Sequence, residues 1–409
     1  MGIGPMVVTV WVGVATYSAG VAETPDLEEL LRRFAGRLEG FDPSGWEIVG
    51  EYRNPWGRVP VTAGGQSLDA RAREYMDRLV ETATRPDPDS KRHHYVPRTY
   101  LKQWGFGKGN RQIWGMDTVT GVMREYSVNS VCVEENFYRV VGAEGEAHNR
   151  VESMFGVVDS ELGRIQKLFS HLEDPEELEF DDLIGLGVTV AIQRMRTAQQ
   201  RRLRLQHDAW LVAQNPVDFK PIHDPANPLR VAGIHTELLF TSMWEAADVM
   251  TTRSIEVWED PEGRFWTSDA PVLVPFHKNK GPNLISAPHI LWPVSPHRVV
   301  ALTNTPTGDK AVIRTASPKE RGLVRKAIEQ CRERWIFASP EQKDALPVRK
   351  KFRRRTQMRM RCSQWTPTGT YVEPPSCCVE MADGFGAGPD VVLCDQGGHF
   401  PAPDMWEYI

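Results

Sequence analysis

Two long helical segments follow one another near the middle of the chain, and the second restricts the fold more than any other feature. Apolar residues recur at steps of four and three over about 148–172, from Val151 to Leu172, which is typical of a helix with one buried face. The next segment, about 177–212, contains LIGLGVTVAI, which is apolar nearly all round a helix. Such a helix needs other elements to cover it, so we expect it to be buried.

The other segments of this region are grouped strands and helices rather than a strict alternation. RQIWGMDTVTGVMREY predicts a hairpin around Thr120-Gly121, and RSIEVWED with GRFWTSD predicts a strand pair that turns at Pro261-Glu262-Gly263. HILWPVS and RVVALTN are typical strands, while GIHTELLFTSMWEAA and SPKERGLVRKAIEQCRERW are typical helices. This grouping favours an α+β fold, with central long helices packed on a mostly antiparallel sheet.

Composition shifts divide the 409 residues into three parts. A small α/β preface and linker occupy 1–90 and end in PDPDS, and the core domain spans 91–345. Within the preface, helices are expected at 24–40 and 67–85, with strand and turn material between them. The last part, 346–409, opens with the basic run RKKFRRRTQMRMR, and we expect its Gly- and Pro-rich tail to be loose or disordered.

Charge and hydropathy exclude several classes of protein. The chain has a net charge of −5 with 41% hydrophobic residues, so it is globular, and any nucleic-acid surface must be local. The apolar run Met6–Val14 is shorter than the roughly 20 residues that span a bilayer, and it lacks the basic start of a signal peptide. We therefore expect a cytoplasmic protein with no membrane association. Four of the six cysteines lie in the last 50 residues, which leaves a local disulfide or metal clip open, although reduced thiols fit better.

Two adjacent histidines, His93 and His94, lie in SKRHHYVPRTYLKQW just before an expected helix, whose first turn suits Pro97. Neighbouring residues of an extended chain point in opposite directions, so one imidazole can face a pocket while the other braces the fold. Two histidines that merely bond to nearby backbone would explain the pair equally well.

Polar residues recur on one face of the apolar second helix, at Thr189, Gln193, Arg196 and Gln200. A buried arginine is costly unless an anion accompanies it. Arg196 therefore indicates either an anionic ligand such as a phosphate or an internal carboxylate, for which Glu152 is the natural partner. The sequence does not favour one of these over the other.

A carboxylate ends the strand in FWTSDAPVLVPF, because Pro271 prevents the strand from continuing beyond Ser268-Asp269 as a central strand. Strand ends present carboxylates to clefts, which would bring Asp269 into a site. The plainer interpretation is that Asp269 caps a turn by bonding its own backbone.

Six segments resemble the DUF4238 family of bacterial proteins, in the order in which that family has them. They cover roughly 91–340 and are HHYVPRTYLKQW, VNSVCVEENFYRV, VESMF, AIQRMRT, WTSDAPVLVPF and LWPVSPHRVVALT. The chain departs from the family pattern at Trp104, where Phe is usual, and at Ala270, where Asn is frequent. The resemblance supplies no reaction. It implies that five polar residues share one site: His93, His94, Gln193, Arg196 and Asp269.

These residue types suit phosphodiester chemistry. Histidine and carboxylate could hold a divalent metal such as Mg²⁺ or Mn²⁺, or act as base and acid, while arginine could clamp a phosphate. We therefore expect a nuclease-like hydrolase, of the kind that serves as a toxin or phage-defence effector, and a basic run at 349–361 that holds nucleic acid. The catalytic candidates are His93, His94, Glu152 and Asp269, and the substrate-binding candidates are Gln193 and Arg196.

Two other interpretations of the same residues remain open. One is a non-catalytic module that binds a nucleotide, a nucleic acid or another phosphate-bearing ligand. The other is a buried polar network that only fixes the packing of helices on the sheet. No H-E-x-x-H, Walker A or G-x-S-x-G motif occurs in a usable context, which disfavours metalloproteases, P-loop proteins and α/β-hydrolases.

Overall fold

The computed structural model describes most of the core domain and parts of its flanks. The described residues are 48–54, 57–62, 90–141, 146–203, 229–251, 253–275, 284, 287–305 and 310–346, with four short strands nearer the C-terminus. The helices expected at 24–40 and 67–85, the end of the second long helix at 204–212 and the basic run 349–361 lie outside them. In the preface, β1 (Ile48–Asn54) and β2 (Gly57–Thr62) form an antiparallel hairpin where strand and turn material was predicted.

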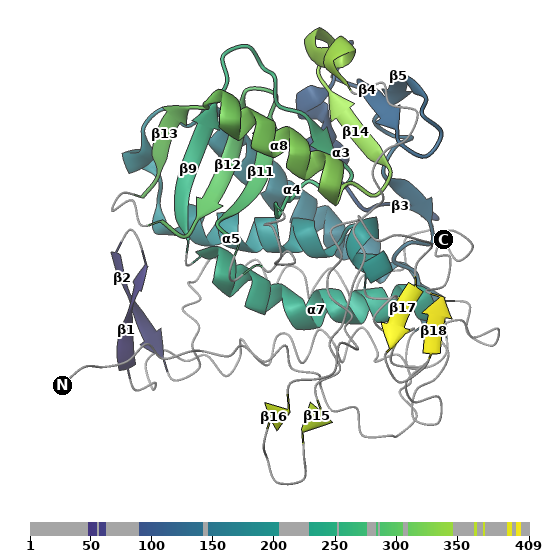
Figure 1. Ribbon diagram of the computed structural model, residues 1–409, viewed down its shortest axis with the longest axis horizontal. Coiled ribbons are helices and arrows are strands. Elements are labelled where there is room, and N and C mark those ends of the chain that lie inside the picture. Colours follow the sequence, from purple (N-terminus) through teal and green to yellow (C-terminus); the bar gives the residue numbers. More distant parts are fainter. Residues whose placement is uncertain are drawn as a thin grey trace.

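A four-stranded sheet in the order β11-β12-β9-β13 forms the middle layer (Figure 1). Its strands are β9 (Ser254–Glu259), β11 (His289–Ser295), β12 (Arg298–Thr303) and β13 (Val312–Thr315). All neighbours are antiparallel except β13 and β9, which are parallel. Alternate residues of β12 enter different cores, Val300 on one side and Val299 on the other. The sheet is therefore buried on both faces.

Helices cover both faces of this sheet (Figure 1). On one face lies α8 (Pro318–Cys331), which begins with a capping box between Ser317 and Glu320. On the other lies α4 (Arg150–His171), followed by α5 (Phe180–Met195) and α7 (Arg230–Thr251). The predicted α+β fold is thus confirmed.

The burial of α5 between its neighbours is also as expected. It packs between α4 and α7. Gly187 permits the close approach of α7, because a Cβ at this position would collide with the side chain of Thr251. No described helix has the length and apolar character needed to cross a bilayer.

A second four-stranded sheet, in the order β10-β14-β4-β5, lies beside the first. Its strands are β4 (Gln112–Asp117), β5 (Met123–Ser127), β10 (Thr267–Ser268) and β14 (Trp335–Ala338). The predicted β4–β5 hairpin is confirmed, and Gly121 in its turn has a φ of 74°. The strand pair predicted around Pro261-Glu262-Gly263 is wrong: a turn is present, but β10 pairs with β14. The reason is that β12 and β13 occupy both edges of β9.

A short ribbon carries the histidine pair and precedes the first helix of the core. It consists of β3 (Arg92–His94) and β6 (Val133–Glu135), and α3 (Arg98–Leu101) and η1 (Lys102–Trp104) follow β3. The Trp104 indole donates to the carbonyl of Phe265 at 2.9 Å, which anchors this segment between the two sheets. The remaining short elements are β7 (Val140–Val141), β8 (Ala147–His148), η2 (Pro175–Glu177), η3 (Pro340–Ala345), β15 (Gln364–Trp365), β16 (Tyr371–Val372), β17 (Val391–Cys394) and β18 (Gly398–Pro401).

The second long helix is interrupted, although a continuous helix to about 212 was predicted. It ends at Met195 with Arg196 as its C-cap, and residues 198–203 form a new helical piece. Thr197 causes the restart, because its Oγ1 accepts from the backbone amide of Gln200 at 3.4 Å, as an N-cap hydroxyl does. The interruption places Arg196 where its side chain can reach across to α4 and β3.

Candidate functional site

The ribbon of β3 and β6 separates the predicted site residues into two groups, because alternate residues of a strand face opposite sides. On one side the backbone of His94 contacts both Arg196 and Glu152. The Arg196 guanidinium donates from Nη2 to the His94 carbonyl at 2.8 Å, and the Glu152 carboxyl hydrogen-bonds to the His94 backbone. Asp269 belongs to the other side, where it lies near Glu134.

His93 is the histidine whose ring braces the fold. Its side chain is fully buried, and both ring nitrogens are hydrogen-bonded to backbone. Nδ1 accepts from the amide of Tyr138 at 2.9 Å, and Nε2 lies 2.9 Å from the carbonyl of Ser90. These partners fix the neutral tautomer with the proton on Nε2.

Arg196 has its anionic companion inside the protein, and that companion is Asp159 rather than Glu152. The guanidinium forms an ion pair with Asp159 and stacks on the Phe155 ring, with Cζ 4.0 Å from the ring centroid. The Tyr138 hydroxyl donates to the Arg196 carbonyl at 2.9 Å. Because these contacts occupy the guanidinium, Arg196 positions the neighbouring residues and its charge is balanced within the fold.

His94 is half-buried, and its ring is neutral near pH 7. Burial, together with the positive charges of Arg98, Arg92 and Arg196, lowers the pKa of His94 to about 4. A hydrogen bond to the backbone of Asn129 opposes this shift. Among the described residues, Nε2 of His94 is buried and has no hydrogen-bond partner. The bond to Asn129 therefore holds the proton on the other ring nitrogen, Nδ1, and leaves a lone pair on Nε2.

Glu152 supplies a carboxyl group of unusually high pKa at the backbone of His94. Burial, opposed by Arg196 and assisted by the nearby Asp159, raises the pKa of Glu152 to about 7. Its Oε2 is buried without a hydrogen-bond partner in the described part of the chain. A carboxyl with such a pKa can donate or accept a proton near neutral pH.

Two exposed arginines stand next to His94. Nη2 of Arg92 donates to the backbone carbonyl of Asn129 at 3.1 Å, and Nη1 of Arg98 lies 3.4 Å from the Asn129 side-chain oxygen. Asn129 thus holds both guanidinium groups on the side of the ribbon that carries His94. We call His94, Glu152, Arg92, Arg98 and the supporting Arg196 the His94 site.

Asp269 is fully buried and is bound to backbone that lies far away in the sequence. Its two carboxylate oxygens accept from the amides of Glu333, Arg334 and Trp335, at 2.9, 2.6 and 2.9 Å. Burial raises the pKa of Asp269 to about 7, although the three amides favour the ionised form. Asp269 therefore caps a turn, as the plainer interpretation had it, but the turn is 333–335 and not its own.

Gln193 lies on α5 and is fully buried. Neither atom of its amide group has a hydrogen-bond partner within the described ranges. Of the six candidate residues, three are connected to one another, because Arg196 and Glu152 both hydrogen-bond to the backbone of His94. The side chains of His93 and Asp269 are instead hydrogen-bonded to backbone groups elsewhere. Within the part of the chain that the structure describes, no three His, Cys, Asp or Glu side chains are grouped to hold a metal ion.

The sequence contained a signal for Asp159, the ion-pair partner of Arg196 that sequence reasoning missed. Asp159 follows Glu152 by seven residues, so both carboxylates lie on the same face of α4. Arg98 and Arg92 carried no comparable signal, because their proximity to His94 depends on the turn after β3 and on Asn129.

Comparison with known proteins agrees with the segments identified in the sequence. A family model described as "Protein of unknown function (DUF4238)" matches residues 92–342. No curated protein and no solved structure shows significant similarity to this chain.

Proposed function

The chain belongs to the DUF4238 family, and we propose that its His94 site hydrolyses phosphodiester bonds, with His94 as general base and Glu152 as general acid. One observation supports this above the others. His94, whose Nε2 has no hydrogen-bond partner among the described residues, is bonded through its backbone to a carboxyl group with a pKa of about 7, and two exposed guanidinium groups lie near its ring. Base, acid and anion clamp are the three groups that such a reaction requires.

The proposed step uses each group once. Nε2 of neutral His94 takes a proton from a water molecule, whose oxygen forms a bond to phosphorus. The bond between phosphorus and the leaving oxygen breaks, and the Glu152 carboxyl gives its proton to that oxygen. The products are a phosphomonoester and an alcohol, and a proton returns from His94 to Glu152 through solvent.

The arginines act differently from one another in this proposal. Arg92 and Arg98 are exposed and can bind the phosphate oxygens, whose negative charge increases as water attacks. Arg196 contacts no substrate. It holds the backbone of His94 through the carbonyl and lies beside Glu152, so it is a positioning residue.

The substitution His94→Gln tests the base directly. We expect hydrolysis of a deoxyribodinucleotide to fall by roughly 100-fold or more, since general bases contribute on that order. The thermal midpoint should change little, because the ring nitrogen Nε2 has no partner to lose among the described residues. The assay is run with Mg²⁺, with Mn²⁺ and with EDTA, and His171→Gln, an exposed histidine at the end of α4, is the matched control.

Two outcomes would overturn the proposal. One is full activity in His94→Gln with a fold as stable as that of the unaltered protein. The other is tight binding of the dinucleotide with no cleavage under any of the three metal conditions, which is the behaviour of a non-catalytic binding module.

A further inference from the structure

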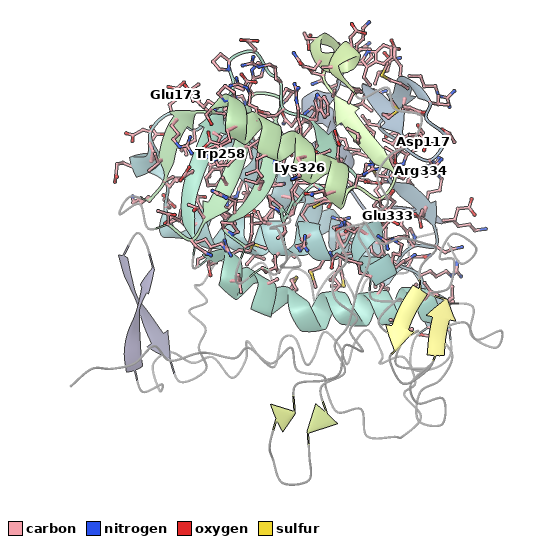
Figure 2. All side chains as sticks on the ribbon, in the orientation of Figure 1. Asp117, Glu173, Trp258, Lys326, Glu333 and Arg334 are labelled. Carbon is pink, nitrogen blue, oxygen red and sulfur yellow. The ribbon has the colours of Figure 1, made fainter. Side chains whose placement is uncertain are left out.

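A small cavity lies on the other side of the ribbon, away from His94. It has a volume of about 80 Å³, and its lining includes Tyr95, Ser130, Cys132, Glu134, Glu333 and Arg334. We call it the Glu134 cavity. Figure 2 shows Glu333 and Arg334 close to β3, with Asp117 just above them. None of these residues has a part in the proposed hydrolysis.

Glu333, the other carboxylate of the lining, already pairs with a cation, and the lining residue Arg334 already pairs with a carboxylate outside the lining. Arg202 binds Glu333 at 2.7 Å, and Arg334 binds Asp117 at 2.8 Å. The nearest cation to Glu134 is Arg201, whose Nη1 is 4.0 Å from Oε2, which is too far for a hydrogen bond. Arg201 instead donates to the carbonyl of Phe137. Glu134 is thus the carboxylate of this cavity with the weakest pairing.

The same oxygen of Glu134, Oε2, is buried and accepts no hydrogen bond from any described residue. Burial, assisted by the negative charges of Glu333 and Asp269 and opposed by Arg201 and Arg334, raises the pKa of Glu134 to about 7. An acceptor that is withdrawn from water and lacks a donor is costly. A ligand that brings both N–H donors and a positive charge would remove that cost.

We propose that the Glu134 cavity binds a small organic cation, an ammonium or guanidinium group that donates its N–H bonds to the Glu134 carboxylate. Tyr95 and Trp335 provide an aromatic wall, which suits a cation. Neutral and anionic ligands would leave the charge of the weakly paired Glu134 carboxylate uncompensated.

The size of the cavity limits the ligand. Pockets for nucleotides and drug-sized molecules have volumes of about 300–1,000 Å³, so the cavity takes a head group of a few heavy atoms. The side chains of Glu134 and Arg334 are 23% and 40% exposed, so the cavity can be entered from solvent beside them. Free amines and the side chain of a peptide share this chemistry.

Calorimetric titration of the full chain with methylguanidinium and with ethylammonium tests the proposal. At least one should bind, and Glu134→Gln should weaken that binding about tenfold or more, because a hydrogen bond to a charged group is lost. Glu135→Gln, which alters the exposed neighbour on the same strand, should leave affinity unchanged. Tetramethylammonium, which has the charge but no N–H, should bind more weakly. Lysine amide acetylated on its α-amine presents only the side-chain ammonium group, as a peptide does, whereas lysine amide also has a free α-amine. Comparing their affinities separates a peptide side chain from a free amine as the ligand.

A second readout does not depend on any variant. Because the cation favours the ionised carboxylate, binding should release protons from Glu134 below pH 7 and tighten as the pH rises through about 7. The groups that face Glu134 and could contribute are Arg201, Glu333, Arg334 and Asp269. Absence of heat with both cations, or equal affinity in Glu134→Gln, would overturn the inference. The His94→Gln variant should bind the cation with unchanged affinity. Failure of the proposed hydrolysis would therefore leave the test of cation binding unaffected.

Discussion

Replacing Asp269 with alanine is expected to lower the free energy of unfolding by about 3 kcal/mol or more, the largest effect of any single substitution considered. The carboxylate accepts three backbone amides, from Glu333, Arg334 and Trp335, in a fully buried position. Alanine would leave all three donors without an acceptor, at about 1–3 kcal/mol for each buried group. Urea unfolding measures the difference.

The variant Asp269→Asn provides the matched control. It has nearly the same shape and keeps one acceptor oxygen, but its NH₂ group faces an amide donor, so an intermediate loss is expected. A loss below about 1 kcal/mol for Asp269→Ala would contradict the role that we assign to this carboxylate.

The substitution Arg196→Met is expected to lower stability by about 3 kcal/mol. It removes the partner of Asp159 and the donor to the His94 carbonyl, and both groups then lie in the protein without compensation. The side chain of Asp159 is 28% exposed, so the loss falls at the lower end of the range for buried ion pairs. Urea unfolding of the single variants and of Arg196→Met with Asp159→Leu gives the coupling between the two residues.

The double variant decides what the ion pair does. Most of the stability should return when both charges are replaced by apolar groups, as is typical of buried pairs. Activity should remain low, because the His94 carbonyl no longer has the guanidinium that holds it. If Arg196→Met alone were as stable as the unaltered protein, Arg196 would not be part of an internal network.

Local patterns in the sequence predicted the helices well, because burial of one face repeats with the period of the helix itself. The seven apolar positions from Val151 to Leu172 that step by four and three, in α4 and at its C-cap, are all buried. The pairing of β10 could not be predicted in this way. It depends on which sheet edge is unoccupied after β9 has paired with β12 and β13, and this is a property of the assembled domain.

The candidate site shows the same limit. The alternation of an extended strand predicted different surroundings for His93 and His94, and burial of Arg196 predicted an anionic companion. The choice of Asp159 over Glu152 depends on side-chain reach between α5 and α4. Asp269 could not be assigned to its turn, because its partners follow it by 64 to 66 residues.

The central claim is that His94 and Glu152 act as base and acid, and the dependence of kcat/KM on pH tests it most directly. Hydrolysis of the dinucleotide requires neutral His94, so activity should rise with pH through about 4. It also requires protonated Glu152, so activity should fall as the pH passes about 7. In Glu152→Gln the residual activity should keep the acidic limb and lose the alkaline one, whereas exposed Glu135→Gln should keep both. An alkaline limb that persists unchanged in Glu152→Gln would contradict the account.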